Sequence, residues 1–231
     1  MGENIGAAAR GMWNFGLEHL CLVAPRDGWP SPAATALASG AAPVLDRVLV
    51  TDTLPDALKD LSYTYAATAR ARTMAKPVVT PECAMAEARR RIAHGESVGV
   101  IFGPERAGLE NGDVARANAI VSAPVNPGFA SLNLAQCVFL MAYEWGRQGA
   151  GQPGQDTPPP GPPRACGADI EALMATLEAR LAARRFFWPE EKAPAMKRRL
   201  RNMLSRMPLT RADIRIWHGI IRFLADRTPK P

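Results

Sequence analysis

Short apolar runs alternate with segments of helical hydrophobic spacing over roughly the first two thirds of the chain. The apolar runs predict strands at residues 20–23, 48–50, 63–68, 97–102 and 118–122. The intervening segments predict helices at residues 4–16, 33–41, 54–61, 81–94 and 132–147. Strands that alternate with helices are typical of a parallel sheet with helical crossovers, and short apolar strands suit a sheet buried on both faces. The pattern therefore predicts an α/β fold built on a parallel sheet.

The pattern begins one element later than such a fold normally does. A doubly wound unit usually opens with a strand that leads into its first helix, but only three residues precede Asn4. The helix at residues 4–16 carries alanine, methionine and phenylalanine side chains that need a sheet beneath them. We therefore expect the first strand to be missing from this chain.

A segment rich in proline and glycine separates the α/β pattern from a helical tail. Its composition predicts a semi-rigid, extended linker. Beyond it, apolar residues recur at helical spacing over residues 169–185 and 193–207, and Thr210 to Asp213 resembles a capping box that opens a last helix. The predicted organisation is an α/β domain at 1–148, the linker at 149–167 and a small all-helical domain at 168–231.

The two parts of the chain differ in charge. Residues 1–150 hold 13 Lys/Arg and 14 Asp/Glu, whereas residues 151–231 hold 15 and 8, so the net charge of +6 comes from the tail. A neutral body with a basic tail suggests that the tail binds a polyanion. A basic surface that merely faces solvent, or a tail that serves dimerisation alone, would give the same composition.

Composition and motifs argue against several classes of protein. The four cysteines are scattered without a C-x-x-C pair, which disfavours a disulfide framework or a zinc site and makes a reducing cytoplasm the expected compartment. We expect neither a signal peptide nor a transmembrane helix, because no segment is apolar enough for either. The three histidines are isolated, and the usual dinucleotide, P-loop and zinc-protease motifs are absent, so no metal site is predicted.

Polar residues follow three of the predicted strands, in the loops at residues 68–70, 103–106 and 123–133. Ligands of parallel sheets bind outside the carboxyl ends of the strands, so these loops predict a binding site at one edge of the sheet.

The last of these loops runs into an apolar helix. Asn126-Pro127-Gly128 has the composition of a turn, and Ser131 stands where a helix N-cap is expected. Ser131, Asn133 and Gln136 interrupt the apolar surface that follows. Buried polar side chains require partners, so these residues face either a backbone network or a ligand.

Three stretches, in order, carry a resemblance to a known family. They are Asn4-Ile5-Gly6 through Arg10 to Gly16, Phe102-Gly103-Pro104-Glu105-Arg106-Ala107-Gly108-Leu109, and Asn126-Pro127 with Ser131-Leu132-Asn133-Leu134-Ala135-Gln136. They resemble the motifs of the SpoU/TrmH family of RNA 2′-O-ribose methyltransferases, within the SPOUT superfamily. Thr68 to Thr73 and the basic helical tail look most like the TrmJ branch, which modifies nucleotide 32 of tRNA anticodon loops. The resemblance covers nearly the whole chain and is weakest in the linker.

The resemblance implies a SPOUT fold with a trefoil knot in the C-terminal half of the α/β domain, an exception to the rule against threaded chains. It also implies a homodimer, S-adenosylmethionine as methyl donor, a tRNA substrate and no metal. Relatives carry a strand before the first motif, which agrees with the missing strand and suggests a start assigned too late or a truncation. The implied cofactor-binding residues are Thr68, Ala69, Arg70, Gly103, Ala123, Ala130, Ser131 and Leu132.

Arg10 matches the catalytic arginine of the family. Arginine stays protonated in proteins, so we expect Arg10 to bind phosphate and the developing alkoxide. The resemblance gives supporting catalytic positions to Asn4, Glu105, Ser131 and Asn133, which would orient Arg10 and the nucleotide. Taken singly, each of these residues would pass for an ordinary surface or capping residue.

Two other functions stay open at this stage. One is 2′-O-methylation of ribosomal RNA, which needs the same chemistry. The other is a non-catalytic RNA-binding protein that retains the fold; the intact motifs argue against it and the missing strand argues for it.

Overall fold

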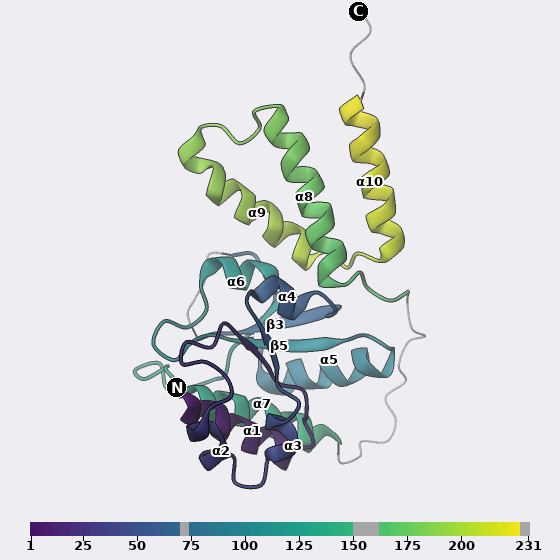
Figure 1. Ribbon diagram of the computed structural model, residues 1–231. Helices are drawn as coiled ribbons and strands as arrows, with labels where there is room; N and C mark the ends of the chain where they lie inside the picture. The colour runs from purple at the N-terminus through teal and green to yellow at the C-terminus, as the bar shows by residue number, and fades with distance from the viewer. Residues whose placement is uncertain (70–73, 150–161, 227–231) are drawn as a thin grey trace, which may run out of the picture.

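The computed structural model describes residues 1–69, 74–149 and 162–226, and Figure 1 shows an α/β body with a module of long helices above it. All strand pairs in the described residues are parallel, as the alternating pattern predicts. The strands form two sheets instead of one. A two-stranded sheet joins β1 (Cys21–Val23) to β2 (Leu49–Thr51), and a four-stranded sheet has the order β4-β6-β3-β5.

The four-stranded sheet is built around β3 (Tyr63–Ala67). On one side β3 pairs with β5 (Val98–Phe102), and on the other it pairs with β6 (Ala119–Val121). The outer strand β4 (Val78–Val79) pairs with β6. The last strand of the sequence therefore lies between two earlier ones.

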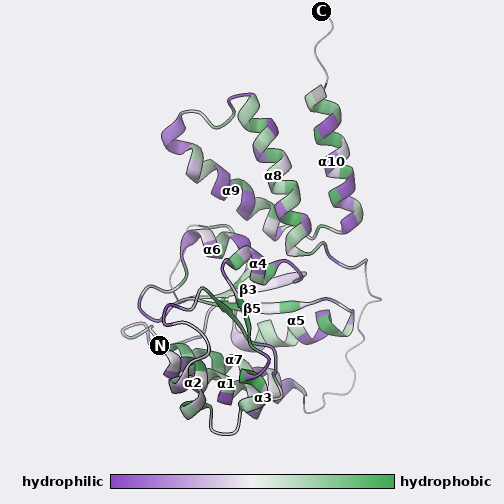
Figure 2. Ribbon diagram, viewed as in Figure 1, coloured by the Kyte–Doolittle hydropathy of each residue, from purple (hydrophilic) through white to green (hydrophobic). Residues whose placement is uncertain are grey.

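Helices cover both faces of this sheet. On one face lie α4 (Leu54–Leu58) and α6 (Asn111–Arg116), above a core that includes Ala66, Val114 and Ile120. On the other face lie α5 (Pro81–Ala93) and α7 (Leu134–Gly149), over a core that includes Tyr65, Met85 and Met141. The apolar strands in Figure 2 lie between these two layers, as expected for parallel strands.

The N-terminal helix α1 (Gly2–Asn14) packs between α2 (Pro32–Ala38) and α7. Its packing on α2 is close, because a Cβ at Gly6 would lie 2.2 Å from the carbonyl oxygen of Ala34. The helix predicted at residues 33–41 ends early, at Ala38, because Ser39 and Gly40 take left-handed conformations. A short helix that was not predicted, α3 (Ala42–Leu45), follows. Asn4 is inside α1 and not its cap, so its side chain is available for other contacts.

Two further short elements escaped the hydrophobic pattern. β4 has two residues and α6 has six, and elements of that length show no periodicity. α6 is instead marked by a capping box in which Glu110 and Asp113 accept from each other's backbone N–H groups.

The C-terminal module contains α8 (Gly167–Ala183), a 3₁₀ turn (Glu190–Lys192), α9 (Ala193–Arg206) and α10 (Arg211–Asp226). It has a core of its own, which includes Leu173, Met174, Leu204 and Ile214. The capping box predicted at Thr210 is confirmed: its N–H and hydroxyl donate to Asp213, whose N–H donates back to Thr210.

Residues 162–167, the end of the segment expected to be a linker, are held in place by backbone pairing; residues 150–161 lie outside the described chain. The Ala165 N–H donates to the carbonyl of Leu209 and the Gly167 N–H to that of Leu61. The Arg164 guanidinium lies 5.0 Å from the centre of the Tyr63 ring. These contacts hold the segment between the α/β body and the C-terminal module.

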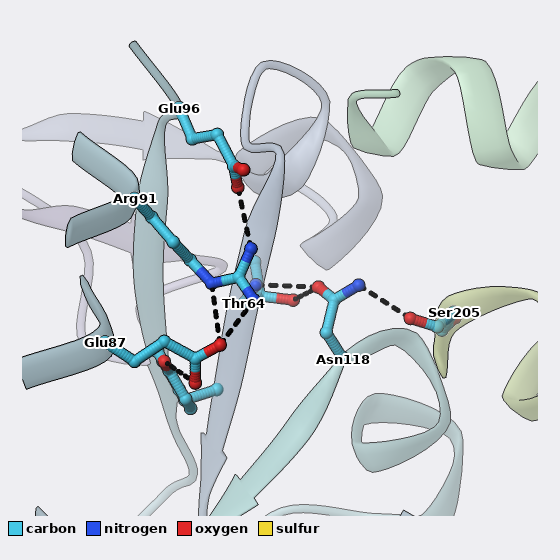
Figure 3. Close-up of polar contacts among 7 residues, drawn as sticks. Thr64, Glu87, Arg91, Glu96, Asn118 and Ser205 are labelled. Atoms are coloured by element: carbon cyan, nitrogen blue, oxygen red, sulfur yellow. Dashed lines mark hydrogen bonds and ion pairs between the residues drawn. The ribbon is translucent and has the colours of Figure 1, made fainter. Parts of the chain in front are cut away.

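A polar network joins the module to the sheet (Figure 3). The side-chain oxygen of Asn118 accepts from the N–H of Thr64 at 2.7 Å, and its amide donates to the carbonyl of Ser205 on α9 at 2.6 Å. Beside it, Arg91 binds Glu87 and Glu96 and stacks on Tyr63 at 3.7 Å. The module is therefore attached to the body by satisfied polar contacts.

Candidate active site

The ends of three neighbouring strands bring the predicted loops together. Register pairs Ala67, the last residue of β3, with Phe102 of β5 and Val121 of β6. The residues that follow, beginning with Thr68, Gly103 and Ser122, therefore emerge side by side at the carboxyl edge of the sheet. The prediction that these loops meet at one edge is confirmed.

The loop after β5 is tightly folded and projects Glu105. A Cβ at Gly103 would lie 2.3 Å from the backbone of both Gly108 and Leu109, so only glycine fits there. The Gly108 N–H donates to the carbonyl of Pro104 at 2.7 Å, and Gly108 has a φ of 64°. Gly103 is thus needed for the close packing of its own loop.

Three of the predicted catalytic residues meet in one hydrogen-bonded cluster, Asn4, Glu105 and Asn133. The Asn4 amide donates to one carboxylate oxygen of Glu105 at 2.6 Å. The Asn133 amide donates to the other carboxylate oxygen at 2.7 Å and to the side-chain oxygen of Asn4 at 3.2 Å. The cluster ties α1, the loop after β5 and the start of α7 to one another. Both carboxylate oxygens already accept, so Glu105 is held as a fixed acceptor.

Asn133 is also the N-cap of α7. Its side-chain oxygen accepts from the N–H groups of Ala135 at 2.9 Å and Gln136 at 3.3 Å. The prediction that Ser131 caps this helix is wrong, because α7 begins at Leu134 and the cap position falls on Asn133. The cap fixes which end of the Asn133 amide faces Glu105.

Arg10 and Ser131 stand outside the cluster. Arg10 follows Asn4 by six helical positions, so it projects about 120° away around the axis of α1, on the exposed side. Ser131 is exposed in the loop before α7. Neither side chain forms a hydrogen bond or an ion pair within the described part of the chain. Both are therefore available to a ligand or to another chain.

The proposed cofactor positions frame the same edge with small residues. Ala69 is exposed, whereas Thr68, Ala123 and Ala130 are half-buried and Leu132 is 36% exposed. The Thr68 N–H donates to the carbonyl of Val121, which holds the first loop against β6. Arg70 lies outside the described residues. Small side chains at an edge of this kind leave backbone groups open to a ligand.

An aromatic cluster that the sequence pattern did not single out lies between the end of α1 and α7. The Phe15 ring meets Phe139 at 5.5 Å and Tyr143 at 5.9 Å, both edge-on. Phe139 is 45% exposed and Tyr143 44% exposed, with Trp13 nearby in sequence at 40%. In the sequence, Phe139 and Tyr143 are four residues apart, which places both rings on one face of α7. The same spacing is also found in the buried core of a helix, so it does not by itself indicate an exposed cluster.

Two kinds of feature are absent from the described residues. No group of three or more His, Cys, Asp or Glu side chains there is placed to hold a metal ion. No helix in the same residues has the length and apolar character to cross a membrane.

Known proteins share both the sequence and the fold of this chain. The model of the SpoU rRNA Methylase family matches residues 2–143. A tRNA (cytidine/uridine/adenosine-2'-O-)-methyltransferase TrmJ from Pseudomonas aeruginosa is 36% identical over 94% of this chain and 87% of its own length. The crystal structure of TrmJ from Z. mobilis ZM4 is 46% identical, covers 97% of this chain and 94% of that one, and superposes with a TM-score of 0.83.

A more distant structure shows the same fold. The SpoU methyltransferase AviRb from Streptomyces viridochromogenes, solved with the cofactor AdoMet, is 17% identical with a TM-score of 0.50 over 64% of this chain. The family match covers more than half of the chain and includes all three motifs that meet at the carboxyl edge. The chain belongs to the SpoU methylase family and resembles TrmJ proteins along nearly its whole length.

Proposed function

We propose that this protein transfers a methyl group from S-adenosylmethionine to a ribose 2′-OH of tRNA, at nucleotide 32 of the anticodon loop. The observation that carries the proposal is the Asn4–Glu105–Asn133 cluster at the carboxyl edge of the sheet in a member of this family. Relatives along nearly the whole chain are named tRNA 2'-O-methyltransferases, which favours tRNA over ribosomal RNA.

The strand-end loops would hold the cofactor. Ala69, Ala123, Ala130 and Ser131 offer small side chains at this edge, which suit an adenine and a ribose. Thr68 and Leu132 flank them, Gly103 keeps the loop after β5 compact, and Arg70 belongs to the same set by sequence. When bound there, S-adenosylmethionine supplies an electrophilic methyl group on a sulfonium. The residues present fit that group, since a compact loop set of this kind can approach a ligand closely.

The protein's own contribution is placement and charge. The guanidinium of Arg10 binds the phosphate beside the reacting ribose and stabilises the negative charge that develops on its oxygen as the proton passes to solvent. Glu105 accepts two amide hydrogen bonds and positions the loops, with Ser131 completing the polar edge. Holding the 2′-OH in line with the methyl group accounts for much of the acceleration in reactions of this type.

Two architectural features belong to the same proposal. A trefoil knot in the second half of the α/β domain is supported by β6, the last strand of the sequence, lying between β3 and β4. A homodimer is supported by the partly exposed rings of Phe139 and Tyr143 beside Arg10-bearing α1. The dimer would bring a second chain to the exposed Arg10. We keep residues 1–148 as the methyltransferase domain and 168–231 as the helical one.

Methyl transfer from labelled S-adenosylmethionine to unmodified bulk tRNA and, in parallel, to ribosomal RNA, followed by mapping of the labelled nucleotide, tests the proposal. Label at nucleotide 32 is the expected result. Label confined to ribosomal RNA would change the substrate and keep the chemistry, and RNA binding without any label would replace the enzyme by a non-catalytic RNA-binding protein.

A further inference from the structure

The connection between α8 and α9 exposes two aromatic rings on a fixed base. Trp188 is 70% exposed and Phe186 54% exposed, whereas Phe187 between them is 9% exposed. The Phe186 ring packs edge-on against Phe187 at 5.4 Å, and the Lys197 ammonium lies 5.4 Å from the centre of the Phe187 ring. The buried ring therefore anchors two exposed neighbours.

These rings lie at the far end of the helical module, which we call the module tip (residues 184–192). α8 begins at the α/β body, where the Gly167 N–H donates to Leu61, and its 17 residues extend about 25 Å away from it. At the tip the Arg184 guanidinium donates to the carbonyl of Ala225 at 3.3 Å, which ties the connection to the end of α10. Figure 1 shows this connection at the end of the module opposite α4 and α6.

The surroundings of the rings are basic. Residues 184–199 contain six Lys/Arg and two Asp/Glu. Arg185, Arg198 and Arg199 are exposed, and none of them forms an ion pair with another residue in the described ranges. Figure 2 shows hydrophilic patches along α9 where it leaves the tip. Exposed rings and unpaired guanidinium groups in one short stretch of the described chain match the chemistry of a single-stranded nucleic acid, which offers flat bases and phosphates in alternation.

We infer that the module tip binds unpaired nucleotides of the RNA substrate, with bases stacked on Trp188 and Phe186 and phosphates bound by Arg185, Arg198 and Arg199. The inference rests on the proposed function, which makes RNA the ligand. A second copy of the chain is a poorer occupant, because a symmetric contact would bring the same arginines of both copies together.

The tip and the candidate site can serve one RNA molecule. α9 runs from the tip back to the body, where it packs on α6, over 14 residues or about 21 Å. α6 begins at Asn111, directly after the loop that carries Glu105. The separation is well within the length of a folded tRNA, so the tip contacts a part of the RNA away from the reacting nucleotide.

Trp188→Ala in the full chain tests the inference, with Trp188→Phe as the matched control that keeps a ring. We expect Trp188→Ala to lower the affinity for an unmodified tRNA transcript roughly tenfold, and Trp188→Phe to stay within a few-fold of the original. The slope of log affinity against log salt should not change, because stacking releases no counterions, whereas Arg185→Ala should reduce that slope by about one. The turnover number at saturating tRNA should be unchanged.

The outcomes separate this inference from the proposed function. Normal methylation with unchanged tRNA affinity in Trp188→Ala would overturn the inference alone. Ring-dependent tRNA binding by a chain that methylates no tRNA would support the inference and refute the proposed activity. Two further results for Trp188→Ala would overturn the inference, each with tRNA affinity intact. One is loss of binding to phosphatidylserine vesicles, and the other is a change of molecular mass measured by light scattering.

Discussion

The cluster of Asn4, Glu105 and Asn133 makes a prediction that depends on which atoms donate. The cap on α7 fixes Asn133, whose amide must donate to both other residues. Asn4 must then accept from Asn133 and donate to Glu105, and Glu105 must accept at both oxygens. In Glu105→Gln one of those oxygens becomes an NH₂ group. That NH₂ group then faces the NH₂ group of Asn4 or of Asn133. Turning either the introduced amide or the Asn4 amide by 180° moves this donor–donor contact to another pair of residues. Every arrangement therefore keeps at least one donor–donor contact.

The size of the effect follows from the contacts that are lost. A hydrogen bond to a charged group contributes about 1.5–3 kcal/mol, and exposure of Glu105 places this cluster at the lower end of that range. We expect Glu105→Gln to lower the catalytic efficiency by about 1–2 kcal/mol of transition-state stabilisation, or roughly five- to thirtyfold. The measurement is single-turnover methyl transfer to tRNA, with cofactor affinity determined by calorimetry.

A second substitution supplies the control. In the double variant Asn4→Asp with Glu105→Gln, the carboxylate at position 4 accepts from both Asn133 and the introduced glutamine, so every contact is again a donor with an acceptor. Asn4→Asp alone places two carboxylates together and should also impair the protein. We therefore expect the double variant to recover most of the activity lost by either single one, with a coupling energy of about 1–3 kcal/mol. Additive losses would refute the assigned hydrogen-bond pattern.

Three further predictions follow from other parts of the molecule. Arg10→Ala should lower methyl transfer at least about a hundredfold while cofactor affinity and melting temperature stay constant, because Arg10 is exposed and lies outside the cluster; retained turnover would exclude its catalytic role. Burial lowers the pKa of Lys76 from 10.5 to about 8. Between these two pH values the Lys76 side chain is therefore neutral in the folded protein and protonated in the unfolded chain. The free energy of unfolding should therefore rise with pH across that window, by at most about 3 kcal/mol, and urea titrations should show a flatter dependence in Lys76→Met; an unchanged pH slope would contradict this. Phe139→Arg should convert a dimer into a monomer by light scattering, because it charges the exposed ring cluster; an unchanged mass would place the dimer interface elsewhere.

The sequence predicted the elements whose side chains repeat and missed those too short to do so. β3 and β5 are apolar runs of five residues, and their parallel arrangement follows from the helices between them. β4 has two residues and depends on its backbone pairing with β6, which no side-chain pattern encodes. Ser131 and Asn133 are both good N-caps, so local preference could not decide between them; the start of α7 did.

The candidate site was predictable in its location and not in its contacts. The rule for parallel sheets places the loops after β3, β5 and β6 at one edge, and the register confirms it. Asn4 and Asn133 are far apart in sequence, and only family resemblance grouped them. The direction of each hydrogen bond came from the cap on α7, a feature that the sequence pattern places at Ser131.

The position of the helical module changes how its role must be tested. The proline and glycine content of residues 149–167 predicted a linker. Composition cannot show that the end of this segment donates backbone hydrogen bonds to the carbonyl groups of Leu61 and Leu209. Deleting residues 150–231 would also remove Ser205, leaving the Asn118 amide without its acceptor at the edge of the sheet core. Loss of RNA binding in such a deletion would therefore mix the loss of a binding surface with damage to the body. Substitutions at exposed positions of the module, such as Trp188 and Arg185, leave the attachment to the body intact and measure RNA contact alone.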